Sequence, residues 1–197
     1  MGLSMKIKEY YIYTDGGCLS SRNKNRDCST GPGGCAFLIL NERGNVLSSG
    51  ARGFRSTDNV RMEMRGIIMA FSSYDILKDV PVYIYTDCAA ITDSINNGHI
   101  NKWINNNWYH HKGYKIRNID LWRQLNVIRN NYKVTFNWVK AHVGIAEKRD
   151  NKPLGSAMKS HNHYNDFCDD MVRQIYRGVA ENLLHIDDRS EVYKLKR

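Results

Sequence analysis

The sequence predicts an α/β domain with a mixed sheet, whose first strands are antiparallel and whose later strands are parallel. Two observations support this: three strand-like segments precede the first helical one, and the later strand-like segments alternate with helical ones. Strands joined by short turns pair antiparallel, whereas strands joined through a helix pair in parallel. The 197 residues, 42% hydrophobic and 25% charged, suffice for one buried core. We expect a single domain over residues 1–197, with its core at about 8–180 and a partly frayed extension at 181–197.

The first three strands are expected at residues 7–14, 35–40 and 46–54. The first segment, IKEYYIYT, is short and rich in aromatic and β-branched residues. The other two flank Asn41–Asn45, a glycine-bearing turn that predicts a hairpin. The polar stretch between Leu19 and Thr30 has no periodicity, and we expect a surface loop there.

The next part of the chain alternates between helical and strand-like patterns. Either Asp58 or Asn59 can cap a helix from about Val60 to Leu77, where apolar residues recur at mostly helical spacing. The following elements are expected, in order, as a strand at 80–86, helices at 88–95, 100–108 and 119–130, and a strand at 133–139.

The C-terminal part is predicted to begin with a long mobile loop. Residues 140–163 are polar and contain Gly144, Pro153 and Gly155, and the triplet His161-Asn162-His163 is interpreted as part of this loop. An amphipathic helix is expected from Tyr164 to about His185.

Positive charge is concentrated in the second half of the chain. The formal net charge is +9, and residues 101–197 carry 18 basic against 10 acidic residues. Within Lys102–Lys133 the basic residues are interleaved with tryptophan and tyrosine. This combination suits nucleic acid better than a membrane, since it matches a polyanion with stackable rings. A solvated basic helix face is the alternative interpretation.

Other sequence features indicate an intracellular protein. No stretch approaches the roughly 20 apolar residues of a membrane helix, and the first residues lack the apolar run of a secretory signal. The five cysteines include no Cys-x-x-Cys pair, so neither a disulfide framework nor a thiol zinc site is indicated. We expect a cytoplasmic protein, a monomer, with no membrane partner.

Two strand-like segments end in the same five residues, Tyr-Ile-Tyr-Thr-Asp, at 11–15 and 83–87. If these strands are parallel neighbours in register, Asp15 and Asp87 lie about 5 Å apart at the carboxyl edge of the sheet, where α/β sheets place ligands. Two carboxylates at so short a distance repel each other unless they share a proton or bind a metal. One aspartate at a strand end is more often a turn or helix cap, so the repeated ending favours a site.

Further candidate residues are expected at the same edge. Glu63 lies on the first turn of the predicted 60–77 helix, where a partner of the helix dipole is the alternative interpretation. Asp169 opens the last helix, although the local sequence does not separate it from Asp166 or Asp170. Such an oxygen-only site suits Mg²⁺ or Mn²⁺, and two ions about 4 Å apart can drive phosphodiester hydrolysis. His142, just past the last strand, could assist proton transfer.

These motifs together resemble the type 1 ribonucleases H, over about residues 8–180. The segments that carry the resemblance are Tyr13–Cys18, Gly31–Gly34, Asn59–Met64, Tyr85–Asp87, Asn118–Trp122, Trp138–His142 and Asn165–Asp169. The resemblance implies the ribonuclease H-like fold, a five-stranded mixed sheet flanked by helices. It also implies metal-dependent endonucleolytic cleavage of the RNA strand of RNA/DNA hybrids, with 5′-phosphate and 3′-hydroxyl ends.

The resemblance further implies a role for each matching residue. Asp15, Glu63, Asp87 and Asp169 would bind two Mg²⁺, with Mn²⁺ as a substitute, and His142 would handle protons. Asp169 is preferred over Asp170 because it follows the cysteine of the family's Asn-x-x-Cys-Asp pattern. The residues implied to contact substrate are Gly16, Gly17, Thr57 and Asn59 in the minor groove, and Trp103, Trp108, Lys112 and Lys115 in a basic aromatic segment, residues 103–122, that we call the handle.

Two other functions remain open from the sequence. A catalytically silent nucleic-acid-binding module would predict a missing acidic residue, yet all four positions are filled. A DNA-acting core of the transposase or integrase type usually comes with separate DNA-binding domains, for which neither flank of the chain is long enough.

Overall fold

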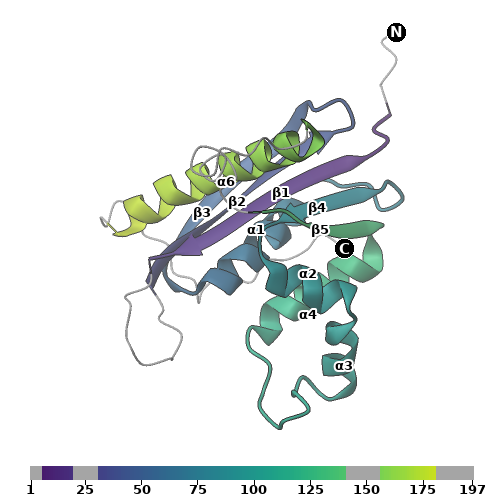
Figure 1. Ribbon diagram of the computed structural model, residues 1–197, viewed down its shortest axis with the longest axis vertical. Coiled ribbons are helices and arrows are strands. Elements are labelled where there is room, and N and C mark those ends of the chain that lie inside the picture. The colour runs from purple at the N-terminus through teal and green to yellow at the C-terminus, as the bar shows by residue number, and fades with distance from the viewer. Residues whose placement is uncertain (1–5, 20–30, 141–155, 181–197) are drawn as a thin grey trace.

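The chain folds around one five-stranded mixed sheet, as expected (Figure 1). The computed structural model describes residues 6–19, 31–140 and 156–180. The strands are β1 (Tyr10–Cys18), β2 (Gly31–Asn41), β3 (Val46–Thr57), β4 (Val82–Thr86) and β5 (Val134–Trp138), in the order β3-β2-β1-β4-β5. The β1–β2 and β2–β3 pairs are antiparallel, and the β1–β4 and β4–β5 pairs are parallel. The predicted antiparallel front half and parallel remainder are thereby confirmed.

The helices lie on both faces of the sheet. Their bounds are α1 (Asn59–Ser73), α2 (Ala89–Asn96), α3 (His99–Asn105), α4 (Ile119–Asn131) and α6 (Ser156–Ala180). The cap of α1 is Asp58, whose carboxylate accepts a hydrogen bond from the Arg61 N–H at 2.9 Å. Among the described helices, none combines the length and the apolar character needed to cross a membrane.

Two predicted helices end earlier than expected. Helix α1 stops at Ser73 instead of Leu77, because Tyr74 adopts an extended conformation and packs edge-on against Tyr10, with ring centroids 6.2 Å apart. Helix α3 stops at Asn105, and the backbone then turns through Asn107 and Trp108, both with positive φ. In both places the helical spacing continues in the sequence, but tertiary packing or a turn ends the helix.

Helix α6 begins eight residues before its predicted start. Residues 156–163 were expected to be loop, and that expectation is wrong, so the His161-Asn162-His163 triplet lies in a helix. The His161 ring stacks on Tyr85, with centroids 4.3 Å apart, and its Nδ1 lies 2.7 Å from the Tyr13 hydroxyl. This turn of α6 therefore rests on the sheet through polar and aromatic contacts, which leave no apolar period in the sequence. The other predictions for residues 20–30, 141–155 and 181–197 lie outside the described part of the chain.

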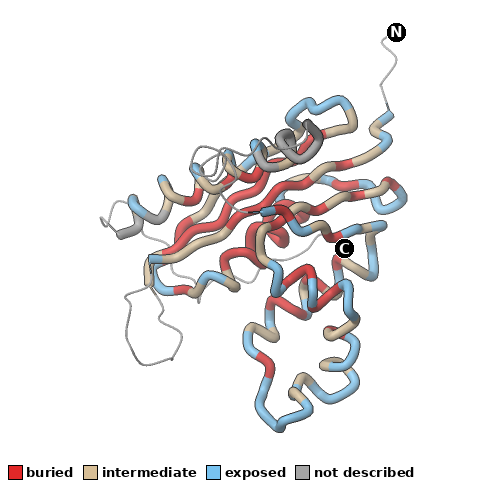
Figure 2. Tube along the Cα trace, in the orientation of Figure 1, coloured by how far each residue is buried: buried red, intermediate tan, exposed pale blue. Residues whose placement is uncertain are grey.

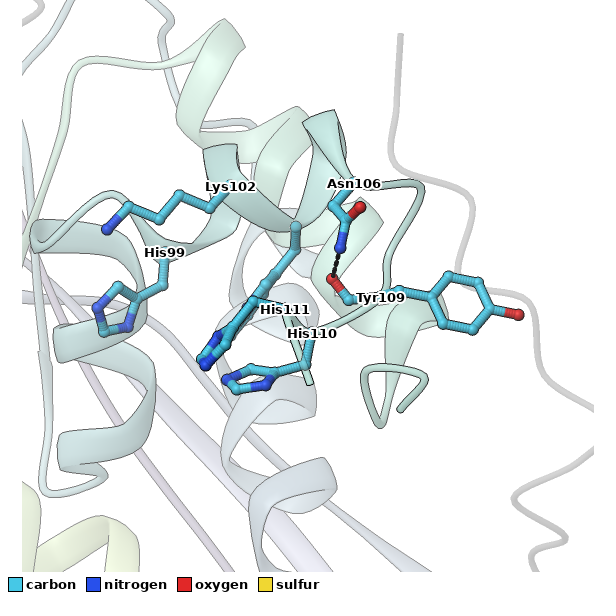
Figure 3. Close-up of a pocket in the computed structure, with 7 residues that line it drawn as sticks. His99, Lys102, Asn106, Tyr109, His110 and His111 are labelled. Carbon is cyan, nitrogen blue, oxygen red and sulfur yellow. Dashed lines mark hydrogen bonds between the residues drawn. The ribbon is translucent and has the colours of Figure 1, made fainter. Parts of the chain in front are cut away.

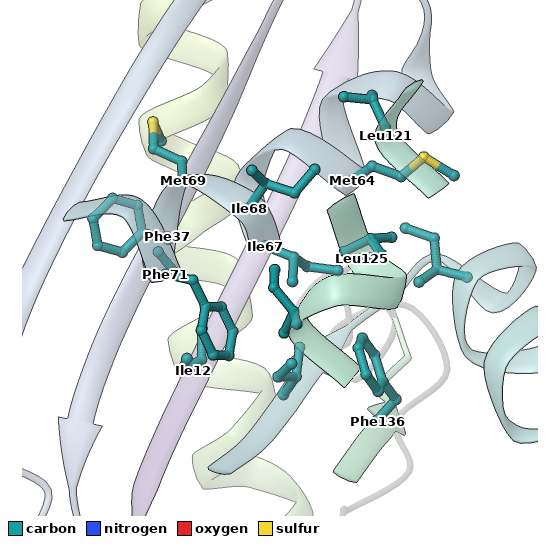
Figure 4. Packing of buried hydrophobic residues seen from close by; sticks show 14 of the residues in the cluster. Ile12, Phe37, Met64, Ile67, Ile68, Met69, Phe71, Leu121, Leu125 and Phe136 are labelled. Carbon is teal, nitrogen blue, oxygen red and sulfur yellow. The ribbon is translucent and has the colours of Figure 1, made fainter. Parts of the chain in front are cut away.

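Hydrophobic side chains fill the space on each side of the sheet. The larger cluster lies between the sheet and helices α1 and α4, where Ile12, Phe37, Ile67 and Leu125 pack together (Figure 4). On the other face, Cys168 and Val172 of α6 are buried with Tyr13 and Leu38. Figure 2 shows that the central strands are buried, whereas the region around α3 is largely exposed. The sheet edge is thus held rigidly between α1 on one face and α6 on the other.

Candidate active site

The register of β1 and β4 brings two aspartates together. The strands are parallel neighbours, with Tyr11 opposite Tyr83 and Tyr13 opposite Tyr85. The repeated Tyr-Ile-Tyr-Thr-Asp segments are therefore aligned, and Asp15 and Asp87 follow at the same edge. Neither aspartate acts as the cap that was the alternative: the N-cap of α2 is Cys88, and Asp15 lies inside β1.

Glu63 reaches the same edge from α1. It lies beyond the first turn of the helix, in which no acidic residue occurs, so the interpretation as a dipole partner loses its basis. At Gly16 a side chain would collide with the backbone of Met62 and Glu63, so this glycine allows α1 to lie directly against β1. The Thr86 hydroxyl donates to Glu63 Oε2 at 3.2 Å.

The three carboxylates form one compact cluster. Asp15, Glu63 and Asp87 each place an oxygen within 4.8 Å of the others. Burial, followed by the charges of Asp87 and Asp169, raises the pKa of Asp15 to about 8. Burial, followed by the charges of Asp15 and Asp87, raises the pKa of Glu63 well above its usual range. Hard oxygen ligands that repel one another at this distance are the donor set that a divalent cation such as Mg²⁺ fits.

Asp169 joins the site from α6. It lines a cavity of about 290 Å³ together with Asp15, Gly16, Gly17, Cys18, Asn59, Glu63, Asp87, Val172 and Arg173. Its Oδ2 lies 2.7 Å from Arg173 Nη2. Asp170, by contrast, is exposed and is not among the residues that line this cavity. Sequence reasoning missed Arg173, although its spacing of four residues from Asp169 on one helix was a usable signal.

The strand beside β4 also supports the cluster. The indole Nε1–H of Trp138 donates to the Asp87 carbonyl at 3.0 Å, and the Val139 N–H donates to the Thr86 carbonyl at 3.0 Å. These bonds fix the end of β4, and with it the backbone of Asp87, although the Trp138 side chain itself is 54% exposed. No local pattern in the sequence indicates this role of Trp138.

The predicted groove residues are only partly brought together. Gly16, Gly17 and Asn59 line the acidic cavity, and Asn59 Oδ1 accepts a hydrogen bond from the Cys18 N–H at 2.7 Å. Thr57 is 2% exposed and lies against Gly33, so its side chain does not reach the cavity surface. His142 lies outside the described residues.

The handle has a second cavity, of about 560 Å³ (Figure 3). Its lining residues are His99, Lys102, Trp103, Asn106, Tyr109, His110 and His111. Trp103 packs edge-on against Trp122 at 5.2 Å, and Trp108 lies under the Arg123 guanidinium at 5.6 Å, so both predicted tryptophans are half-buried. Lys112 and Lys115 are exposed, as a contact with a polyanion requires. The three histidines of this cavity were not singled out from the sequence.

Comparison with known proteins identifies a family from the sequence and similar folds from the structure. The family model described as RNase H matches residues 7–176. Ribonuclease H of Caldicellulosiruptor saccharolyticus is 34% identical over 175 residues, which are 88% of this chain and 99% of that protein. The fold is similar to LC9-RNase H1, a type 1 RNase H, with a TM-score of 0.64, 22% identity and coverage of 89% of this chain and 75% of that one. It is also similar to LC11-RNase H1 in complex with RNA/DNA hybrid, with a TM-score of 0.56, 18% identity and coverage of 89% and 99%.

Proposed function

The chain belongs to the RNase H family, and we propose that it hydrolyses the RNA strand of RNA/DNA hybrids in a metal-dependent endonucleolytic reaction. One observation carries the proposal: the carboxylates of Asp15 in β1, Glu63 in α1 and Asp87 just after β4 place oxygens within 4.8 Å of one another, and Asp169 of α6 lines the same cavity. A protein that only binds nucleic acid gains nothing from negative charge gathered against a phosphate backbone. The acidic cavity therefore argues against a silent binding module.

In this proposal the four carboxylates hold two Mg²⁺, for which Mn²⁺ can substitute. Asp15, Glu63 and Asp87 would hold one ion, and Asp15 with Asp169 the other, since Asp15 feels the charge of both Asp87 and Asp169. When bound, such ions supply an activated water and stabilise the departing 3′ oxygen, which leaves 5′-phosphate and 3′-hydroxyl ends.

The protein's own groups orient this chemistry. Thr86 holds the Glu63 carboxylate, and the Trp138 indole holds the backbone of Asp87. Both reduce the freedom of ligands that repel one another. His142, which follows β5 in sequence, is proposed to pass a proton to or from the reacting oxygens.

Hybrid recognition is proposed to be divided between the cavity and the handle. The Gly16–Gly17 backbone and Asn59 would contact the minor groove, where 2′-hydroxyls distinguish RNA from DNA. Thr57 would contribute there through its backbone, because its side chain is buried. Lys112 and Lys115, with Trp103 and Trp108, would hold the DNA strand.

We further propose that the enzyme works as a monomer in the cytoplasm. All four carboxylates come from one chain, so the site needs no second copy. In the described part of the chain Cys18, Cys88 and Cys168 form no disulfide, which agrees with a reducing compartment. A sedimentation mass of two chains, or inactivation under reducing conditions, would contradict these points.

The test is cleavage of one labelled RNA strand, presented as RNA/DNA hybrid, RNA duplex and single strand, with Mg²⁺ or with chelator. We expect cutting of the hybrid alone, and a loss of at least about 100-fold in Asp87→Asn, because a metal ligand is removed. The matched control is Asp170→Asn, which removes an exposed acid of α6.

Two results would contradict the proposal. Tight hybrid binding without cutting under any metal would support the silent binding module. Cutting of duplex DNA in preference to the hybrid would support a DNA-acting core of the transposase or integrase type.

A further inference from the structure

The fourth carboxylate of the site is paired with a cation from its own helix. Asp169 and Arg173 are one turn apart on α6, with Oδ2 and Nη2 2.7 Å apart, and both line the acidic cavity. The buried Cys168 and Val172 dock this turn on the sheet, so the pair is held at the edge. A charge-assisted contact of this length is a strong one.

Asp169 lies apart from the compact cluster of the other three carboxylates. The group of described residues with oxygens within 4.8 Å comprises Asp15, Glu63 and Asp87, without Asp169. The site thus consists of a compact cluster, suited to a first cation, and a separate carboxylate whose oxygen already contacts a guanidinium. A second cation between Asp15 and Asp169 that used Asp169 Oδ2 would have to share or displace that contact.

We propose that Arg173 stays paired with Asp169 until the second ion binds. This pairing raises the concentration of divalent metal that is needed to fill the second site. This inference rests on the proposed two-ion function. Arg173 acts here as a positioning residue, through Asp169, and no contact of Arg173 with substrate is assumed.

Electrostatics predicts how the replacement of Arg173 changes the affinity of the site for metal. Replacement of Arg173 by a neutral residue removes the guanidinium contact of Asp169 Oδ2 and a positive charge that also acts on Asp15. Both changes favour the binding of a cation at Asp169. The Arg173 side chain is 36% exposed, so solvent screens part of its charge, and we expect the weaker of two ions to bind about three- to tenfold more tightly.

The experiment measures metal binding in the absence of nucleic acid. Calorimetric titration with Mn²⁺ would compare wild type, Arg173→Gln, Arg173→Lys and Arg177→Gln. Arg177 lies one turn further along α6 and is exposed, so its substitution removes the same charge without touching Asp169. We expect tighter binding of the weaker ion in Arg173→Gln only, with Arg173→Lys close to wild type because the charge remains.

A second readout is stability. In chelator Arg173→Gln should melt at a lower temperature than Arg177→Gln, because the repulsion between Asp15 and Asp169 is no longer offset, and Mg²⁺ should raise its melting temperature by more than that of wild type.

The outcomes separate this inference from the proposed function. If wild type binds metal and cuts hybrid, but Arg173→Gln binds metal as wild type does, Arg173 is only a helix-stabilising partner and the inference fails. Weaker metal binding in Arg173→Gln would also overturn it, since Arg173 would then be needed to present Asp169. If wild type neither binds metal nor cuts hybrid, the proposed function itself fails.

Discussion

Asp15 is the residue on which the acidic side chains of the cavity converge. Its carboxylate is 6% exposed, and the charges of Asp87 and Asp169 both act on it. In the folded chain without metal, burial and these two charges disfavour ionisation of Asp15. They raise its pKa to about 8. The same repulsion that lowers stability without metal favours the binding of a cation.

This repulsion predicts how stability without metal depends on pH. Because the pKa of Asp15 is higher in the folded than in the unfolded chain, its contribution is fully present below about pH 4 and is lost as pH rises toward about 8. Asp15→Asn cannot ionise, so in chelator at pH 8 it should be more stable than wild type, by roughly 1–3 kcal/mol. Denaturant unfolding from pH 5 to 8 measures this difference. Asp170→Asn is the control, and an Asp15→Asn protein less stable than wild type at pH 8 would contradict the argument.

At the scale of elements, the docking of α6 decides whether Asp169 reaches the site. Cys168 and Val172 anchor the middle of the helix, and His161 anchors the turns before it by stacking on Tyr85. Burial raises the pKa of Tyr13 far above its usual value, so its hydroxyl keeps its proton and lies 2.7 Å from His161 Nδ1. Protonation of His161 would bring a positive charge into this partly buried contact.

The His161 contact predicts that acid loosens α6. Burial lowers the pKa of His161 below its model-peptide value of 6.5, so its contribution to stability is complete above about pH 6.5 and is lost as pH falls through the folded-state pKa. His161→Phe keeps a stacking ring without a titrating group, so it should remove this part of the pH dependence. Hydrogen exchange of α6 amides between pH 5 and 7.5 would measure it. His163→Phe, at an exposed position two residues on, is the control, and equal acid sensitivity in all three proteins would refute the idea.

The pattern of elements also explains which parts of the site the sequence could predict. The two Tyr-Ile-Tyr-Thr-Asp segments predicted the β1–β4 register, because identical segments on parallel neighbours align residue by residue. The position of Glu63 on α1 followed from the helical spacing. The early start of α6 could not be predicted, since His161, the first residue of the helix whose side chain is described, meets the sheet through a polar and aromatic contact that leaves no apolar period in the sequence. The burial of Thr57 depends on packing against Gly33, which no local pattern records.

At the scale of the whole molecule, opposite charges are separated between two regions. Carboxylates gather at the sheet edge, whereas α3 and the loop after it project from the sheet and carry the histidines and lysines of the handle (Figure 1). A phosphate backbone is attracted to the handle and repelled by the edge unless cations offset its charge. The affinity for hybrid in the absence of metal should therefore come mainly from the handle.

His110 of the handle makes that affinity sensitive to pH. It lines the cavity there together with His99, His111 and Lys102, with no acidic residue among the lining side chains. Burial, followed by the charges of His111 and Lys112, lowers the pKa of His110, so it gains its charge only below about pH 6.5. Each proton added there strengthens attraction to phosphate.

We therefore expect Asp87→Asn, used as a non-cutting background in chelator, to bind hybrid more tightly at pH 5.5 than at pH 7.5, by about three- to tenfold at low salt. Replacement of His110 by Gln in that background should reduce the pH dependence, to which the buried Asp15 also contributes, and replacement by Lys should tighten binding at pH 7.5. Fluorescence anisotropy of a labelled hybrid measures this, with His163→Gln on α6 as the control. If the His110→Gln variant keeps the full pH dependence, His110 does not meet the phosphate backbone, and the charge that responds to pH lies elsewhere in the molecule.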